Sequence, residues 1–250
     1  MSNERLLVVD DDESVLEYLE AALEVSGYSV VSASTATEAL GKMRASAEKF
    51  PVILSDIMMP GLNGLEFLKI IKKDFPDSMV LMLTAHTSMD TAVKSLNEGA
   101  FAYLAKPINI DELKNALKNA YDRYRLIQEN KRLVEELNKA KDYLENIVQN
   151  LVHIVVATDS GGVIKKTNRA LENLLGYTES ELIGSPLQKI FSDEFKQTAL
   201  SDLMSKGHVK DFPVIFLAKD RRQIRLTFTG TIMKDVKGQV VGFLGTAETR

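Results

Sequence analysis

Short apolar runs alternate with amphipathic segments along the first half of the chain. The runs are rich in valine, isoleucine and leucine, which is typical of buried strands, and apolar residues between them recur at the spacing of helices. Five strands are predicted at Leu6–Val9, Ser29–Ala33, Val52–Ser55, Met79–Leu83 and Ala102–Leu104. Five helices are predicted at Glu13–Ser26, Ala36–Ala45, Gly64–Asp74, Ser88–Glu98 and Asp111–Ala120.

This alternation predicts an α/β domain in which helices cover a parallel sheet. With right-handed crossovers, five such units form a flavodoxin-like, doubly wound, five-stranded sheet. Function in such sheets collects at the carboxyl ends of the strands, where the strand order reverses.

A long stretch without proline or glycine follows. Charged residues interleave with leucines from Asp111 to about Gln149, so one long helix is predicted. With Leu137 at position a of a heptad, the a positions are Asn130, Leu137, Leu144 and Leu151, and the d positions are Leu126, Leu133, Ala140 and Ile147. Leucine at d with one asparagine at a favours two parallel strands. The connector is therefore predicted to form a coiled-coil homodimer; the alternative is a single amphipathic helix that lies on its own domains.

The remainder of the chain predicts a smaller α+β domain. Ile154–Ala157 and Val163–Lys165 flank a glycine turn and predict a hairpin, and Thr178 with Glu181 has the spacing of a capping box. A helix at Asp193–Ser205 and three mostly antiparallel strands follow, at Val209–Leu217, Gln223–Met233 and Gln239–Ala247. The expected domain limits are 1–122 for the first domain, 123–149 for the helical connector and 150–250 for the second domain.

Composition excludes several kinds of chemistry. The chain has 250 residues, enough for two domains with separate cores, no cysteine and a net charge of −4. Disulfides, thiolate zinc sites and cysteine nucleophiles are thereby excluded, and a nucleic-acid partner is not expected. Because the chain has no signal-peptide pattern and no run near the roughly 20 apolar residues that span a bilayer, we expect no membrane partner and a cytoplasmic location.

Acidic, hydroxyl and basic residues follow four of the five predicted strands of the first domain. They are Asp10, Asp11 and Asp12, then Asp56, Thr84 and Lys106. Clustered carboxylates repel one another unless a cation lies among them, and Mg²⁺ prefers one or two carboxylates with water and phosphate oxygens. The set predicts Mg²⁺-assisted phosphoryl transfer to Asp56, with Thr84 and Lys106 stabilising the charge of the transferred group. Each residue alone also suits a solvated strand end, so the prediction depends on their joint occurrence.

These motifs resemble the receiver domain of bacterial response regulators. The resemblance covers residues 1 to about 122 and is carried by Val8-Val9-Asp10-Asp11, Asp56-Ile57-Met58-Met59-Pro60 with Gly64, Leu83-Thr84-Ala85, and Lys106-Pro107. The nitrogen-regulation-type subgroup is the most similar, through Leu83-Thr84-Ala85-His86 and the segment from Gly99 to Pro107.

The resemblance implies a partner and a role for each matching residue. The partner is a histidine kinase or a phosphotransfer protein, and the domain is a phosphoacceptor with at most slow self-dephosphorylation rather than an enzyme. The implied site comprises Asp56 as phosphoacceptor and metal ligand, Asp11 and the Met58 carbonyl as further ligands, and Asp10 acting through water. The implied switch residues are Thr84, Tyr103 and Lys106, with a cis bond before Pro107. The residues leave open which two of the three consecutive aspartates face the metal, and whether His86 is a base or a loop residue.

The second domain resembles PAS sensory domains from about residue 143 onward. The matching segments are Leu144-Glu145-Asn146-Ile147-Val148, Ile154–Asp159, Thr167-Asn168-Arg169-Ala170, Leu174-Leu175-Gly176-Tyr177, Glu181–Leu187 and Gly238–Gly245. These motifs are structural and leave the ligand of the domain open. Neither His153 nor His208 lies on the helix from which haem-binding members usually supply a ligand, so no cofactor is predicted. Asp220-Arg221-Arg222 lacks the glycine that often follows the aspartate, so this turn should be longer or strained.

Together, these features predict a two-component response regulator in which phosphorylation of Asp56 acts through the connector on the PAS domain. A PAS domain filled by side chains and used for dimerisation is expected ahead of a ligand sensor. Three alternatives stay open. The first is the N-terminal part of a larger sensor kinase or output protein whose PAS domain binds a ligand or cofactor. The second is a scaffold whose second domain only pairs subunits, and the third is a cofactor-based redox or gas sensor with an accessory receiver.

Overall fold

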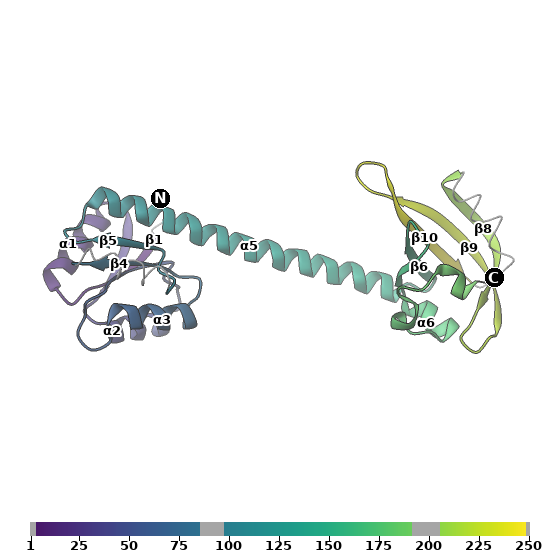
Figure 1. Cartoon of the computed structure of the whole chain (residues 1–250), viewed down its shortest axis with the longest axis horizontal. Coiled ribbons are helices and arrows are strands. Elements are labelled where there is room, and N and C mark those ends of the chain that lie inside the picture. The colour runs from purple at the N-terminus through teal and green to yellow at the C-terminus, as the bar shows by residue number, and fades with distance from the viewer. Residues whose placement is uncertain (1–3, 86–97, 192–205, 249–250) are drawn as a thin grey trace. The chain divides into compact units, whose positions relative to one another are not determined.

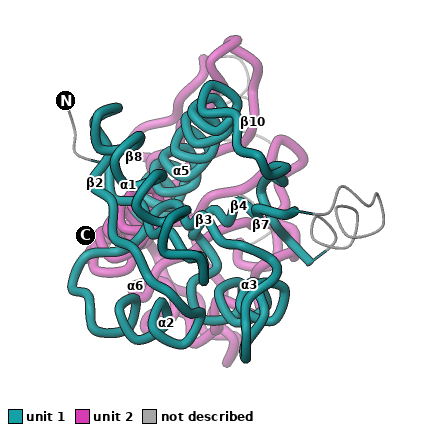
Figure 2. The backbone as a smooth tube through the Cα atoms, turned by 90° about the vertical axis from the view of Figure 1, so that its left-hand side faces the viewer, with its two compact units in different colours: residues 1–135 teal, residues 136–250 magenta. Residues whose placement is uncertain are grey.

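The computed structural model describes residues 4–85, 98–191 and 206–248. The predicted helix at Ser88–Glu98, apart from Glu98 itself, lies outside the described residues, as do His86 and the predicted helix at Asp193–Ser205. The chain forms two compact units, residues 1–135 and residues 136–250, coloured separately in Figure 2. The long helix α5 (Ile110–Asn150) begins in the first unit and ends in the second.

The first unit is built on a parallel five-stranded sheet in the order β2-β1-β3-β4-β5. Its strands are β1 (Glu4–Val9), β2 (Tyr28–Ala33), β3 (Val52–Asp56), β4 (Met79–Thr84) and β5 (Ala102–Ala105). The described helices between them are α1 (Glu13–Glu24), α2 (Ala36–Ala45) and α3 (Gly64–Asp74). The predicted flavodoxin-like fold is confirmed, with strand order reversing at β1, between β2 and β3.

Helices pack on both faces of this sheet, which explains why its strands read as continuous apolar runs. Leu7 and Val9 of β1 pack in a cluster with α2 and α3 on one face, and Leu6 and Val8 pack with α1 and α5 on the other. Figure 1 shows α2 and α3 together on one side of the sheet.

Polar side chains fix where the helices of this unit begin. Thr35 caps α2, and Asn63 forms a capping box with Glu66 at the start of α3. The end of α1 differs from the prediction, since the helix stops at Glu24 rather than Ser26. After Glu24 the hydrogen bonds join residues three apart, as in the bond from Gly27 N–H to the Glu24 carbonyl at 2.9 Å. Gly27 has a φ of +91°, a left-handed conformation that is common where helices end.

The helix α5 is continuous over 110–150 and agrees within one residue with the helix predicted from Asp111 to about Gln149. Its first turns are buried against the first unit through Leu113, Leu117, Ala120 and Tyr121. The predicted seam lies further along, where Leu126, Leu133, Leu137 and Leu144 are 51–69% exposed and Asn130 is also exposed. Among the described helices, none combines the length and apolar character needed to cross a membrane.

The second unit is an antiparallel five-stranded sheet in the order β7-β6-β10-β9-β8 with short helices beside it. The strands are β6 (Ile154–Asp159), β7 (Ile164–Thr167), β8 (His208–Leu217), β9 (Gln223–Lys234) and β10 (Val240–Glu248). The helices are α6 (Arg169–Leu175), α7 (Glu179–Leu182) and the 3₁₀ turn η1 (Leu187–Ile190). The predicted α+β domain is confirmed, and so is the capping box, in which Thr178 N–H donates to Glu181 Oε2 at 3.0 Å.

Aromatic rings fill the centre of this second unit. Phe191 packs edge-on against Phe216 and Phe228, with ring centroids 4.5 and 5.6 Å apart. The Phe228 ring lies over the cross-strand pair Gly230 and Gly245, where an added Cβ would come within 2.8 and 2.4 Å of ring carbons. The three rings are therefore core, as predicted together with Leu171, Leu175 and Ile190. Leu203, from the same prediction, lies outside the described residues.

The β8–β9 turn shows the strain expected from its missing glycine. Arg221 adopts a left-handed backbone with a φ of +67°, which L-residues with long side chains rarely adopt. Its N–H donates to the Ala218 carbonyl at 2.9 Å, so the tight turn is closed despite this conformation.

Candidate functional site

Four adjacent strands of the first unit bring one residue each to the same edge of the sheet. Asp10 directly follows β1, Asp56 and Thr84 are the last residues of β3 and β4, and Lys106 directly follows β5. Asp10, Asp56 and Thr84 are 0%, 6% and 1% exposed. Asp10, Asp56, Thr84 and Lys106, which were predicted from the strand ends, thus lie together at one edge of the sheet.

Lys106 connects two carboxylates of this pocket. Its Nζ donates to Asp10 Oδ2 at 2.6 Å and to Asp56 Oδ2 at 2.7 Å. The backbone holds the lysine in place, since Lys106 N–H donates to the Thr84 carbonyl at 2.7 Å. The bond between Lys106 and Pro107 is cis, as the resemblance implied.

Burial and charge oppose each other in this pocket. Burial raises the pKa of the Asp10 carboxyl above its ordinary value, although hydrogen bonds from Lys106 and the Asp12 N–H act in the opposite direction. Burial also disfavours the charge of Lys106, but its hydrogen bonds to Asp10 and Asp56 outweigh this, so the pKa of Lys106 is raised. The lysine is therefore charged at neutral pH, and its ammonium compensates part of the acidic charge.

Three carboxylates are close enough together to hold one metal ion. One oxygen each of Asp10, Asp11 and Asp56 lies within 4.8 Å of the others. Two are buried and Asp11 is exposed, so the group opens toward solvent. Hard oxygen ligands with an open side suit Mg²⁺, which keeps several waters and binds phosphate oxygens.

The third consecutive aspartate has a different task. Asp12 is the N-cap of α1, and its Oδ1 accepts from Ser14 N–H at 2.9 Å. Hydrogen bonding from the Ser14 side chain, followed by that from the Ser14 N–H, lowers the pKa of Asp12. Because the Asp12 side chain caps the helix, Asp10 and Asp11 are the two of the three aspartates that cluster with Asp56.

The backbone beside Asp56 is tightly folded. Met58 N–H donates to Asp56 Oδ1 at 3.3 Å, while the Met58 side chain is 68% exposed. Gly64 N–H donates to the Ile57 carbonyl at 3.0 Å, and a Cβ on Gly64 would lie 2.1 Å from the Asp56 carbonyl oxygen. Gly64 therefore positions Asp56, a role that its place in the sequence motif did not explain.

The remaining predicted residues lie around the pocket or away from it. Tyr103 on β5 is partly buried and packs against the apolar cluster shared with α2 and α3. His208 is exposed at the start of β8, and the exposed His153 forms an ion pair with Glu248, its Nε2 lying 3.3 Å from Glu248 Oε2. Both histidines thus lie outside the aromatic centre of the second unit.

Comparisons with known proteins agree with this division. Residues 6–118 match the family model of the response regulator receiver domain, and residues 151–248 match that of the PAS domain. The chain is 34% identical over 148 residues to the C4-dicarboxylate transport transcriptional regulatory protein DctD of Rhizobium meliloti (strain 1021), covering 59% of this chain and 32% of the relative. It is 43% identical over 118 residues to the DNA-binding transcriptional regulator NtrC of Escherichia coli (strain K12), covering 47% of this chain and 24% of the relative.

A solved structure matches the first half as well. A crystal structure titled adenylate cyclase from Rhodopirellula baltica is 34% identical with a TM-score of 0.50, covering 53% of this chain and 98% of that one. The chain spans about a third or less of the length of the curated relatives named above.

The parallel sheet and its acidic edge define a receiver domain, a phosphoacceptor module that uses Mg²⁺ at such a pocket. Residues 6–118 form a response regulator receiver domain, and residues 151–248 form a PAS domain. The curated proteins that are similar to the first domain include NtrC-type regulators.

Proposed function

We propose that this chain is a two-component response regulator in which Asp56 accepts a phosphoryl group from a partner histidine kinase or phosphotransfer protein. The observation that carries the proposal is the Lys106 ammonium, held 2.6 and 2.7 Å from the carboxylates of Asp10 and Asp56 at the open acidic edge of the sheet. A carboxylate nucleophile beside a fixed cation and a metal-binding group is the arrangement that phosphoryl transfer needs.

Asp11, Asp56 and the Met58 carbonyl would hold Mg²⁺ directly, and Asp10 would hold it through water. The bound metal would supply positive charge that offsets the charge of the donor phosphate beside the Asp56 carboxylate. An Asp56 oxygen forms a bond to phosphorus while the bond from phosphorus to the donor breaks, and the donor keeps that electron pair. Lys106 and Thr84 donate to the oxygens of the transferred group.

The change is then relayed along the chain. The transferred group adds negative charge between Lys106 and Thr84, and Tyr103 lies on β5, the strand that ends directly before Lys106. Lys106 lies shortly before Ile110, where α5 begins, so a shift of the β5 end is passed directly to the connector. We assign residues 1–122 to the receiver, 123–149 to the connector and 150–250 to the PAS-like domain.

Labelling with a small phosphodonor tests the phosphoacceptor. Acetyl phosphate with Mg²⁺ should add one phosphoryl group by intact mass, and Asp56→Asn should abolish it. Asp12→Asn is the matched control, because asparagine caps a helix as well as aspartate does, and this variant should label normally. Lys106→Ala should still label but should lose the conformational response. Labelling that persists in Asp56→Asn would refute the assignment.

We further propose that the connector pairs two copies of the chain through the exposed seam of Leu126, Asn130, Leu133, Leu137 and Leu144. Six large apolar side chains from Leu126 to Leu151 at a and d positions are at least 43% exposed, a stripe whose burial needs a second helix. Leu137→Asp should convert a dimer to a monomer by light scattering, whereas Asn138→Asp, on the adjacent outer position, should leave it dimeric. A monomeric wild type would contradict this proposal without affecting the phosphorylation proposal.

A further inference from the structure

A cavity of about 580 Å³ lies in the second unit where α5 ends and β6 begins. The end of α5 and the segment that follows it, residues 149–154, form one wall, and α6 forms another. Leu226 of β9 and Ala247 of β10 contribute from the sheet. Its volume lies within the range of about 300–1,000 Å³ that small-molecule sites occupy.

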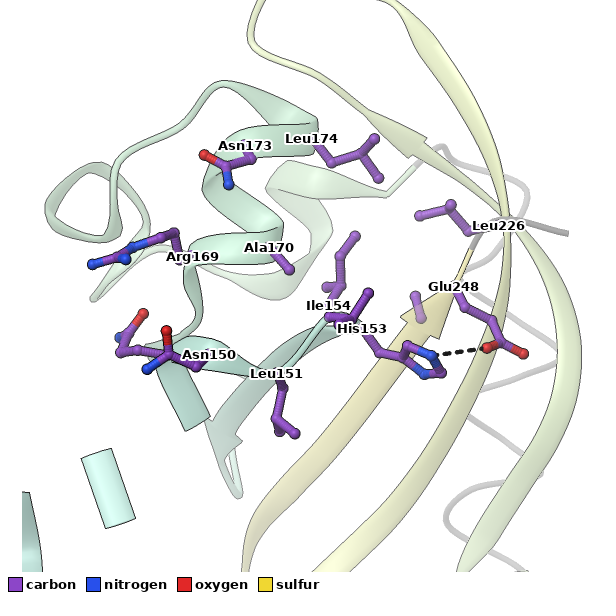
Figure 3. A pocket seen from close by; sticks show the side chains of 13 residues that line it. Asn150, Leu151, His153, Ile154, Arg169, Ala170, Asn173, Leu174, Leu226 and Glu248 are labelled. Atoms are coloured by element: carbon purple, nitrogen blue, oxygen red, sulfur yellow. Dashed lines mark ion pairs between the residues drawn. The ribbon is translucent and has the colours of Figure 1, made fainter. Parts of the chain in front are cut away.

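The lining of this junction cavity divides into an apolar base and a polar rim. Ile154, Leu226 and Ala247 are buried, and Figure 3 shows Ile154, Leu174 and Leu226 around the same space. Arg169 and Asn173 lie on the α6 side of the rim, whereas the ion pair of His153 with Glu248 lies on the opposite side. The cavity therefore suits a molecule with one apolar and one polar end.

A buried asparagine fixes the shape of the cavity. Asn168, 1% exposed, caps α6, and its Oδ1 accepts from Leu171 N–H at 3.3 Å and from Val155 N–H at 2.9 Å. Its Nδ2 donates to the carbonyls of His153 at 2.8 Å and Leu151 at 3.3 Å. Both walls are thus tied to one amide, so the cavity is preformed rather than created by a ligand.

This cavity is separate from the aromatic centre of the domain. Phe191, Phe216 and Phe228 occupy the middle of the unit against the glycine pair, and none of the three lines the cavity. A ligand at the junction therefore displaces no core side chain.

The charges around the rim indicate the ligand chemistry. Within the described ranges, the Arg169 guanidinium forms no hydrogen bond or ion pair, and Asn173 lies one helical turn further on the same face of α6. On the other side, Glu248 would repel an anion, and His153 Nε2 lies 3.3 Å from its carboxylate. We propose that the junction cavity binds a small amphipathic organic anion, with its charged group at Arg169 and Asn173 and its apolar body over Ile154, Leu174 and Leu226.

Such a ligand contacts the connector and the sheet at once. Gln149 and Asn150 belong to the last turn of α5, and Ala247 and Glu248 end β10. Binding therefore adds an input at the PAS end of the same helix that begins at the receiver, and this input does not depend on phosphorylation.

Two fluorescent probes with the same apolar body test the site in the full chain: anilinonaphthalene sulfonate, which is anionic, and the neutral phenylnaphthylamine. Both should bind the wild type, and decanoate should displace them. Ala170→Leu, which fills the cavity, should lower the affinity for both probes by about tenfold or more. Arg169→Gln should lower the affinity for the anionic probe by about fivefold, because the charge-assisted contact is lost. The affinity for the neutral probe should stay within about twofold of the wild-type value.

Arg222→Gln, in the β8–β9 turn and outside the lining of the cavity, is the control for nonspecific charge effects and should change the affinity for neither probe. Circular dichroism checks that each variant is folded, and the exposed position of Arg169 keeps the test valid if Ala170→Leu misfolds. Absence of probe binding to the wild type, or equal binding to Ala170→Leu, overturns the proposal. So does loss of binding in Leu137→Asp but not in Ala170→Leu, because the probe would then lie between two copies of the chain.

Discussion

Lys131 on α5 donates to both carboxylate oxygens of Asp77, at 2.7 and 2.8 Å. Asp77 lies in the loop between α3 and β4, and Gln128 of α5 also donates to it at 3.2 Å. The receiver end of the connector is thereby fixed beyond the turns that are buried in the core.

A corresponding contact fixes the other end of the connector. Lys166 on β7 pairs with Glu145 on α5 and with Glu179 on α7, and Gln149 donates to the Thr167 carbonyl at 3.2 Å. The hydrogen bond from Lys166 lowers the pKa of Glu145. Leu133, Leu137 and Leu144 of the proposed seam lie between these two sets of contacts. Pairing of that segment would therefore affect the contacts at both ends of the connector.

The Asp77 contact predicts a pH dependence of stability. Hydrogen bonding to Lys131, followed by that to Gln128, holds the pKa of Asp77 below its usual value despite some burial. A carboxyl with a lowered folded-state pKa contributes stability above its unfolded pKa near 4, and this is lost as pH falls through the lower folded value. Because Asp77 is partly exposed, the contribution should be about 0.5–1 kcal/mol.

Urea denaturation checks this prediction. Asp77→Asn should lower the midpoint of the receiver transition at pH 7, and the difference from wild type should vanish at a pH below the folded pKa. Lys131→Gln should reproduce the same profile. A difference that persists unchanged at low pH would mean that the carboxylate charge is not responsible.

Gly64 should be indispensable for the geometry of Asp56. A methyl group on Gly64 would meet the Asp56 carbonyl oxygen at 2.1 Å and the Ile57 Cα at 2.8 Å, both backbone atoms that cannot move aside alone. Gly64→Ala should therefore cost about 1–3 kcal/mol of stability and slow phosphorylation by displacing Asp56. Thermal unfolding and acetyl phosphate labelling measure the two effects. Gly41→Ala, in open space on α2, is the control and should be neutral or stabilising.

Asn168 should be the most sensitive polar residue of the PAS domain. Asn168→Ala removes all four of its hydrogen bonds and leaves buried backbone groups without a partner, so a loss of about 2–4 kcal/mol is expected. Asn173→Ala, on the exposed face of the same helix, should change stability by less than about 0.5 kcal/mol. Urea denaturation of both variants measures the two losses of unfolding free energy. Small and equal losses would show that water readily replaces the hydrogen bonds of Asn168.

The β8–β9 turn offers a stabilising substitution. Arg221 has a positive φ, which is strained for an arginine and unstrained for a glycine. Arg221→Gly should therefore raise the free energy of unfolding by about 0.5–1 kcal/mol. Arg222→Gly, at a position without a positive φ, should be neutral or destabilising. A rise in the thermal midpoint for the first variant alone is the expected result, and a fall for Arg221→Gly would show that its side chain stabilises the turn.

The hydrophobic pattern by itself determined most of the fold. The strand positions followed from apolar runs and the helix positions from the spacing of apolar residues. Both signals are local, because they depend only on which nearby residues face the sheet or the core. The pocket could also be predicted, since the carboxyl ends of parallel strands must share an edge, and this brings Asp10, Asp56, Thr84 and Lys106 together.

Only the tertiary structure decided the features that depend on contacts between residues distant in the chain or on local backbone geometry. Three consecutive aspartates are equivalent in the sequence, and only the start of α1 distinguishes Asp12 from its neighbours. The closeness of Gly64 to Asp56 depends on how the intervening loop folds back. Likewise, the junction cavity exists because Asn168 ties the end of α5 to α6, and a cavity is a property of packed surfaces that no local pattern of residues encodes.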